Sequence, residues 1–256
     1  MNLELFRKLV FEALEGSFMN KGDDAHLYGF GEPTLHDQLD EMILLLSSNW
    51  ISTKINTNAL AIDEGLWQRL SLSGLSKCLI SLDGLDEESY LRYRKGGDFN
   101  RVIQNTRYIC AHPNSTEIEL QFIAFQYNEE KLEDFIKFAK DIGAHVATIK
   151  KPRTWVGGTA DFEGLRNLSA QHIRDKKSIN CRFSEDYGLV LQNGDLTVCT
   201  ADAFGRYSIG NIFEKGPSLW ESEDFKRVRA LAETKVLELC ENCGYKDAYV
   251  KKIRLK

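Results

Sequence analysis

Four cysteines in the last third of the chain have the spacing of a metal or iron–sulfur site. Cys181, Cys199, Cys240 and Cys243 are separated by 17, 40 and 2 residues. The two-residue gap lets one centre bind both later thiolates, and Asn193-Gly194 between apolar alternations predicts a hairpin that brings the two earlier ones near it. Four thiolates fit either zinc or an iron–sulfur cluster, and unlinked buried thiols are the third interpretation.

The composition is that of an ordinary globular protein. Of the 256 residues, 43% are hydrophobic and 28% charged, and the net charge of −5 argues against a nucleic-acid-binding surface. No apolar run approaches the ~20 residues that cross a bilayer, and the N-terminus is unlike a signal peptide. We therefore expect a cytoplasmic protein with no membrane or nucleic-acid partner, and no disulfides. The basic residues Lys251, Lys252, Arg254 and Lys256 are expected to form a solvated end.

The first 150 residues alternate segments of helical and strand character. Strands are expected near residues 26–28, 51–55, 78–82, 118–125 and 146–149. Helices are expected near residues 3–14, 39–46, 66–70, 87–94, 101–110 and 128–143, the last capped by Asn128. This alternation predicts an α/β fold with a parallel sheet, whose strand ends gather polar residues on one rim. The chain opens with a helix, so an expected first strand is absent from the pattern.

The alternation stops near Lys151-Pro152-Arg153. The following stretch is polar and glycine-containing, which is typical of a linker. Beyond it we expect the hairpin, a helix from Leu219 to about Leu231, and a tight turn at Cys240. The sequence thus predicts a main domain at residues 1–153, a linker at 154–180 and a second domain at 181–256.

Short motifs at the strand ends, taken in order with the cysteines, resemble one known family. They are Tyr28-Gly29-Phe30-Gly31-Glu32-Pro33, Asn56-Thr57-Asn58, Ser81-Leu82-Asp83-Gly84, Arg94, Gln121 to Asn128, Gly210-Asn211-Ile212 and Leu219-Trp220. The chain resembles radical S-adenosylmethionine (radical SAM) enzymes with a C-terminal SPASM or shorter "twitch" extension. Each motif is weak alone, but their ordered combination covers nearly the whole chain and is specific.

The resemblance implies a partial (β/α)6 TIM-like barrel that lacks its first strand, followed by a small hairpin–helix extension. It implies that S-adenosylmethionine (SAM) is held at the strand ends. Gly29, Gly31, Glu32 and Pro33 match the segment that holds the amino group of SAM. The matching residues on the next two strand ends are Asn56, Asn58, Ser81, Asp83 and Arg94, of which Ser81 and Arg94 match contacts to the ribose and carboxylate. Ala59 stands where the family has glycine.

The resemblance also implies that the four cysteines ligate an auxiliary [4Fe–4S] cluster, with zinc as the alternative. A cluster with four protein ligands has no open iron, which favours electron transfer. The expected reaction is hydrogen abstraction from a peptide or an aminocyclitol- or sugar-like substrate, with flavodoxin or ferredoxin as an electron donor. No individual catalytic residue can be assigned.

One element of the family is not found in these residues. The Cys-x-x-x-Cys-x-x-Cys triplet of the SAM-cleaving cluster does not occur, and the other cysteines, Cys78 and Cys110, lie in apolar settings. Either the sequence is a piece of a longer active enzyme, or it is a pseudo-enzyme that binds a ligand beside a structural iron–sulfur or zinc site, or a second chain supplies the element. We favour the first, and expect no SAM cleavage by the chain as it stands.

Overall fold

A six-stranded sheet organises the larger of two compact units in the computed structural model, which describes residues 1–16, 18–152, 187–234, 236–241 and 250–256. The strand order is β1-β2-β3-β4-β5-β8. The first five strands are parallel, and β8 joins β5 in the antiparallel sense. The strands are β1 (Asp24–His26), β2 (Ser52–Thr57), β3 (Lys77–Ser81), β4 (Glu117–Ile123), β5 (Val146–Lys150) and β8 (Val250–Arg254). The predicted α/β class with a mainly parallel sheet is confirmed.

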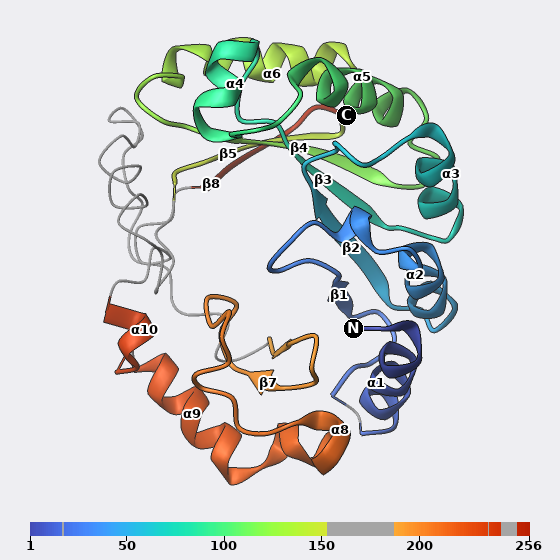
Figure 1. The fold of residues 1–256 in the computed structure, drawn as a ribbon, viewed down its shortest axis with the longest axis vertical. Coiled ribbons are helices and arrows are strands. Elements are labelled where there is room, and N and C mark those ends of the chain that lie inside the picture. The colour runs from blue at the N-terminus through green and yellow to red at the C-terminus, as the bar shows by residue number, and fades with distance from the viewer. Residues whose placement is uncertain (17, 153–186, 235, 242–249) are drawn as a thin grey trace. The chain divides into compact units, whose positions relative to one another are not determined.

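Helices cover the outer face of this sheet, as Figure 1 shows for α2 to α6. They are α2 (Leu39–Ser48), α3 (Glu64–Leu72), α4 (Glu87–Tyr93), α5 (Phe99–Ala111) and α6 (Leu132–Asp141), with short 3-10 turns η1 (Pro33–Leu35) and η2 (Glu129–Lys131). Successive strand side chains alternate between faces, so every second residue meets the helices. Ile80, Leu120, Phe122 and Ile149 are such residues, and all are buried in one apolar core.

The basic end of the chain forms strand β8, which the sequence did not indicate, although its four basic residues are exposed as expected. Lys252 pairs in register with Thr148 of β5, and Arg254 pairs with Val146. Ile253, on the other side of the strand, packs against the apolar core. An edge strand rich in lysine is a common way to keep a sheet edge from recruiting other chains. The high charge of this segment therefore does not prevent it from forming a strand.

The second unit combines the first helix with the described residues between 187 and 241. It comprises α1 (Leu3–Glu15), the hairpin β6 (Leu189–Val190) and β7 (Leu196–Thr197), α8 (Ile212–Lys215), η4 (Pro217–Glu221), α9 (Glu223–Glu233) and α10 (Glu238–Glu241). The Asn193-Gly194 hairpin is confirmed, with Gly194 at φ +93°. The expected helix from Leu219 is interrupted at Ser222, whose hydroxyl accepts a hydrogen bond from Phe225 N at 3.2 Å and starts α9.

The compact units group two segments differently from the boundaries expected from the sequence. Helix α1 belongs with the C-terminal unit, where the Phe18 ring just beyond it stacks on Trp220 with centroids 5.6 Å apart. A Cβ on Gly16 would lie 2.2 Å from the Pro217 Cβ, so this close approach requires glycine. Strand β8 belongs with the sheet. The expected linker at 154–180 lies outside the described residues.

Candidate functional site

The loop after β1 is tied to the loop after β2 by one carboxylate. Glu32 Oε2 accepts a hydrogen bond from Asn58 N at 2.8 Å, and its Oε1 accepts from Thr34 N and Thr34 Oγ1 at 3.2 and 2.6 Å. Gly31 before it has φ +97°, in the left-handed region that glycine adopts without strain. Both carboxylate oxygens thus accept hydrogen bonds from the protein, and Glu32 fixes the conformation of the loop. The ammonium group of a ligand would therefore donate mainly to backbone carbonyl oxygens of this loop.

The ends of β2 and β3 are joined by a second polar contact. Ser81 Oγ donates to Asn56 Oδ1 at 3.0 Å, and both side chains are half-buried. Asn58 forms an Asx turn, accepting from Leu60 N at 2.9 Å. Ala59, next in the chain, is buried at φ 58°, which explains why glycine suits this position. The structure therefore places Asn56, Asn58 and Ser81 at one rim, where the first and last are in direct contact.

The turn after β3 is built around a buried ion pair. Asp83 is 0% exposed and accepts from Arg94 Nε at 2.7 Å, while Arg94 Nη2 meets the same carboxylate oxygen. The other oxygen accepts from Ile123 N at 2.6 Å. Burial opposes the charge on Arg94, but the Asp83 carboxylate raises the pKa of its guanidinium. Arg94 is thus fixed at the rim, with two of its nitrogens already engaged by protein.

Asn128 joins the same rim in a role that the sequence did not indicate. It precedes η2 but makes no side-chain cap, so the predicted capping contact is wrong. Its amide Nδ2 donates to Asp83 O at 3.2 Å and to Ile123 O at 3.1 Å, and its Oδ1 accepts from Phe125 N at 2.7 Å. A fully buried amide that satisfies three backbone groups fixes the loops after β3 and β4 together.

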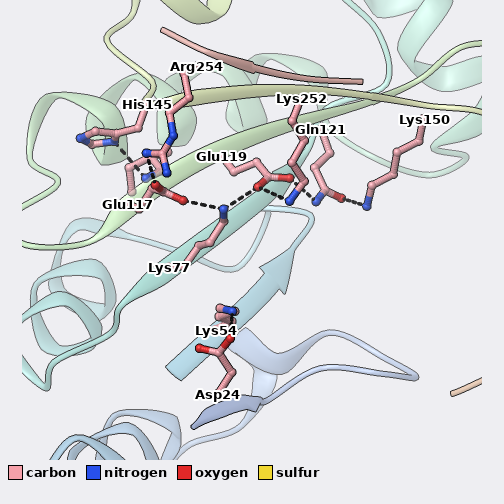
Figure 2. A network of polar contacts seen from close by, with 11 residues as sticks. Asp24, Lys54, Lys77, Glu117, Glu119, Gln121, His145, Lys150, Lys252 and Arg254 are labelled. Carbon is pink, nitrogen blue, oxygen red and sulfur yellow. Dashed lines mark hydrogen bonds and ion pairs between the residues drawn. The ribbon is translucent and has the colours of Figure 1, made fainter. Parts of the chain in front are cut away.

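The inner face of the sheet, opposite the helices, carries a charged network that sequence reasoning missed (Figure 2). Lys77 Nζ lies 2.5 Å from Glu117 Oε1 and 2.7 Å from Glu119 Oε2. Arg254 Nη1 contacts the other oxygen of Glu117 at 2.9 Å. Glu119 is 0% exposed, yet its pKa is lowered to about 2, because contacts with Lys77 and neighbouring polar groups outweigh the effect of burial. The same contacts raise the pKa of Lys77 against the opposing effect of burial.

Two of the four candidate cluster cysteines are described, and both are buried in one apolar group. Cys199 is 7% exposed and Cys240 6% exposed. Cys199 Sγ accepts a hydrogen bond from Ala201 N at 3.4 Å, the type of contact that stabilises a ligating thiolate. The loop after Cys199 is fixed by buried Asp202, which accepts from Thr197 Oγ1 at 2.7 Å. Cys181 and Cys243 lie outside the described residues.

These residues fit the groups that the sequence implied. A cluster ligand needs a buried sulfur with amide donors nearby, and Cys199 provides both. A nucleoside ligand needs hydroxyl and amide groups near a backbone that approaches closely, which Asn56, Ser81 and Gly31 provide. Cys78 and Cys110 fit neither role, since burial raises the pKa of both thiols and holds them protonated.

Comparison with known proteins identifies the class. The profile of the Radical SAM superfamily matches residues 6–142, and that of the SPASM iron–sulfur cluster-binding domain matches residues 181–244. The chain belongs to the radical SAM superfamily and carries a SPASM domain. Within the described residues, no helix is both long and apolar enough to span a membrane.

Curated relatives match either about half of this chain or nearly all of it. A probable GTP 3′,8-cyclase of Methanocaldococcus jannaschii is 31% identical over 121 residues, which cover 47% of this chain and 40% of that protein. The tungsten-containing aldehyde ferredoxin oxidoreductase cofactor-modifying protein of Pyrococcus furiosus is 19% identical, with 97% of this chain and 80% of that protein covered. The match to the cyclase thus spans less than half of either protein.

Solved structures share the fold over almost the whole chain. Streptococcus suis SuiB matches with a TM-score of 0.67 at 16% identity, covering 94% of this chain and 64% of that one. Native anSMEcpe with bound AdoMet and Cp18Cys peptide matches at 0.64 and 16%, covering 96% and 79%. BtrN in complex with AdoMet and 2-DOIA matches at 0.56 and 16%, covering 95% and 80%. These likenesses confirm a radical SAM fold of the partial-barrel type.

Proposed function

We propose that this chain is the SAM- and substrate-binding part of a radical SAM oxidoreductase or maturase with an auxiliary [4Fe–4S] cluster. The reaction is removal of a hydrogen atom from a peptide or an aminocyclitol- or sugar-like substrate, with the auxiliary cluster as electron acceptor. The observation that carries the proposal is the convergence of Glu32, Asn56, Ser81 and Arg94 on one rim, in a chain that also carries the SPASM cysteines.

The rim residues hold the cofactor in distinct ways. Ser81 Oγ donates to Asn56 Oδ1, which leaves the Asn56 NH2 group and the Ser81 lone pairs for ribose hydroxyls. Arg94 offers its remaining nitrogen, Nη1, to the cofactor carboxylate, while Asp83 fixes the plane of the guanidinium. The loop at Gly31 lets backbone carbonyls accept from the cofactor ammonium. When bound and cleaved, SAM supplies the radical that abstracts hydrogen.

The auxiliary cluster is assigned to Cys181, Cys199, Cys240 and Cys243. Two of these thiolates lie in a shared apolar environment, which limits solvent access and so influences the potential of a bound cluster. Four protein ligands favour electron transfer over substrate ligation. The proteins that match nearly all of this chain support this choice of reaction class, because they include a cofactor-modifying protein and structures bound to a peptide or to 2-DOIA.

Anaerobic purification followed by iron, sulfide and zinc analysis tests the cluster. We expect about four irons and four sulfides per chain. Cys199→Ala and Cys240→Ala should lose most of this iron, whereas Cys110→Ala, the matched control in the barrel core, should retain it. About one zinc without sulfide would contradict the oxidoreductase proposal and favour the alternative, a non-catalytic binding protein with a structural metal.

SAM cleavage requires a cluster whose three-cysteine motif these 256 residues do not contain. We therefore expect this chain, reduced with dithionite in the presence of SAM, to form no 5′-deoxyadenosine above the protein-free background. Liquid chromatography measures this product directly. Steady formation of 5′-deoxyadenosine by the purified chain would show that another set of ligands holds the SAM-cleaving cluster.

A further inference from the structure

The inner face of the sheet carries more cationic than anionic side chains among the residues that the structure describes. Five cations, Lys54, Lys77, Lys150, Lys252 and Arg254, share this face with three carboxylates, Asp24, Glu117 and Glu119. Neighbouring residues in register lie on the same face of a sheet, and the ion pairs between these strands confirm the assignment.

Each of the three carboxylates described on this face contacts a cationic side chain, and these contacts lie near the N-terminal ends of the parallel strands. Lys77 contacts both Glu117 and Glu119, and Arg254 contacts Glu117. Lys54 contacts Asp24. Lys252 is a second, more distant partner of Glu119, and Lys150 donates to the Gln121 amide. These two lysines therefore add positive charge to a face whose three described carboxylates already contact Lys77, Arg254 or Lys54.

One of those two lysines, Lys252, lies in the row of residues that contains Ser81, and Lys150 lies beside that row. In register, Ser81 pairs with Gln121, Gln121 with Thr148, and Thr148 with Lys252. Lys150 lies two residues beyond Thr148 on the same face of β5, toward the rim where the parallel strands end. Both lysines thus occupy the side of the inner face across from Asn56 and Ser81, where a substrate beside bound SAM would lie.

A buried amide fixes the position of Lys150. Gln121 is 4% exposed; its Nε2 donates to Glu119 Oε1 at 2.9 Å, and its Oε1 accepts from Lys150 Nζ at 2.7 Å. Because Glu119 takes the NH2 group, the amide oxygen must face the lysine. Lys252 Nζ lies 3.6 Å from Glu119 Oε2, and its side chain is 59% exposed. One ammonium is thus held in place, and the other remains accessible.

We propose that Lys150 and Lys252 recognise an anionic group of the substrate, a carboxylate or a phosphate, on the inner face of the barrel. This inference rests on the proposed function, since it assigns a substrate class to the same site. An anion between the two ammonium groups would offset the excess positive charge, and each contact would be a charge-assisted hydrogen bond. Gln121 is a positioning residue that acts through Lys150.

The test is binding of two simple anions to the full chain, measured by isothermal titration at low salt. Inorganic pyrophosphate probes for a phosphate site and glutarate for a carboxylate site. We expect one of them to bind, and Lys150→Gln and Lys252→Gln to weaken that binding by about tenfold each, the loss of one charge-assisted contact. Lys251→Gln is the matched control, because Lys251 pairs with Ile149 and points to the opposite face of β8.

A second variant separates positioning from folding. Gln121→Met keeps the length of the side chain but removes the oxygen that accepts from Lys150, so anion binding should weaken while the circular dichroism spectrum stays that of the wild type. The proposal is overturned if neither anion binds the wild type, or if Lys251→Gln weakens binding as much as Lys252→Gln. Neither result would alter the iron and sulfide content, so failure of this site is distinguishable from failure of the proposed function.

Discussion

The two faces of the central sheet use the same strands for different purposes. On the outer face, Ile80, Leu120 and Phe122 are fully buried in a core shared with the helices. On the inner face, the adjacent residues of the same strands are Ser81, Glu119 and Gln121, which contact other polar groups. Because successive side chains point to opposite faces of the sheet, residues that pack the core alternate along each strand with residues that line the polar inner face.

A closed barrel usually fills its interior with branched apolar side chains. Here the inner face contains buried charges that are stable only as pairs, since an isolated buried ion is very costly. The outer face should therefore control stability in proportion to its buried apolar volume. The inner face should control ligand binding, and it should affect stability only where a charge would lose its partner.

The largest effect is expected on the outer face. Phe122 is 0% exposed and packs on Phe135 with ring centroids 4.8 Å apart, so Phe122→Ala should lower the free energy of unfolding by about 3–5 kcal/mol. Ser81→Ala, on the inner face of a neighbouring strand, should lower it by less than about 1.5 kcal/mol, the contribution of one hydrogen bond. Urea denaturation measures both. Similar losses from the two variants would break the distinction between the faces.

The buried ion pair at the rim should give the next largest effect. Asp83→Ala leaves Arg94 without its carboxylate and removes the acceptor for Ile123 N, so we expect a loss of about 3 kcal/mol. Asp83 has φ 56°, a conformation that asparagine tolerates, so Asp83→Asn should lose less. Denaturant unfolding of the pair of variants checks this order. An equal loss from both would mean that the charge alone, and not the backbone bend or the acceptor for Ile123 N, determines stability here.

Glu119 should make stability depend on pH. Its pKa is lowered from 4.5 to about 2 in the folded protein, so the carboxylate stabilises the fold above about pH 4.5, and this contribution is lost as the pH falls toward 2. The shift corresponds to a contribution of at most about 3 kcal/mol. Urea midpoints between pH 5 and pH 2 should fall less steeply for Glu119→Gln than for the wild type. Parallel curves would contradict a stabilising role for the charged form.

The smallest effect concerns backbone strain at the rim. Ala59 is held at φ 58°, where a Cβ costs roughly 1–2 kcal/mol, while its buried methyl contributes roughly 0.8 kcal/mol. Ala59→Gly should therefore stabilise the protein slightly, by less than about 1 kcal/mol. Ala147→Gly, at a buried position of strand β5, should destabilise it. Thermal unfolding compares the two, and equal losses would show that Ala59 is unstrained.

Local sequence signals were enough to predict most of the sheet. The expected strands at 51–55 and 78–82 correspond to β2 and β3 within two residues, because buried strands are apolar runs bounded by turns. The hairpin at Asn193-Gly194 was found for the same reason. Strand β8 was missed because its lysines resemble a solvated end, and its partner β5 lies far away in the sequence.

The residue types of the site could be predicted, but their roles could not. The four cysteines and the polar strand ends stand out by type and spacing. That Glu32 holds Asn58, or that Asp83 holds Arg94 and Ile123, depends on distances between segments that are remote in the sequence. The network of Lys77, Glu117 and Glu119 left no local pattern, because it arises from the register of two strands.

We propose that the inner face at the rim binds SAM while the outer face packs the core. The most direct measurement is the dissociation constant for SAM, together with the free energy of unfolding, for two variants of strand β3. Ser81→Ala should weaken SAM binding by about tenfold, or 1.4 kcal/mol, with little loss of stability. Cys78→Ala, on the buried outer face, should lower stability and leave the dissociation constant unchanged. Unchanged SAM binding by Ser81→Ala, or weakened binding by a folded Cys78→Ala protein, would contradict the account.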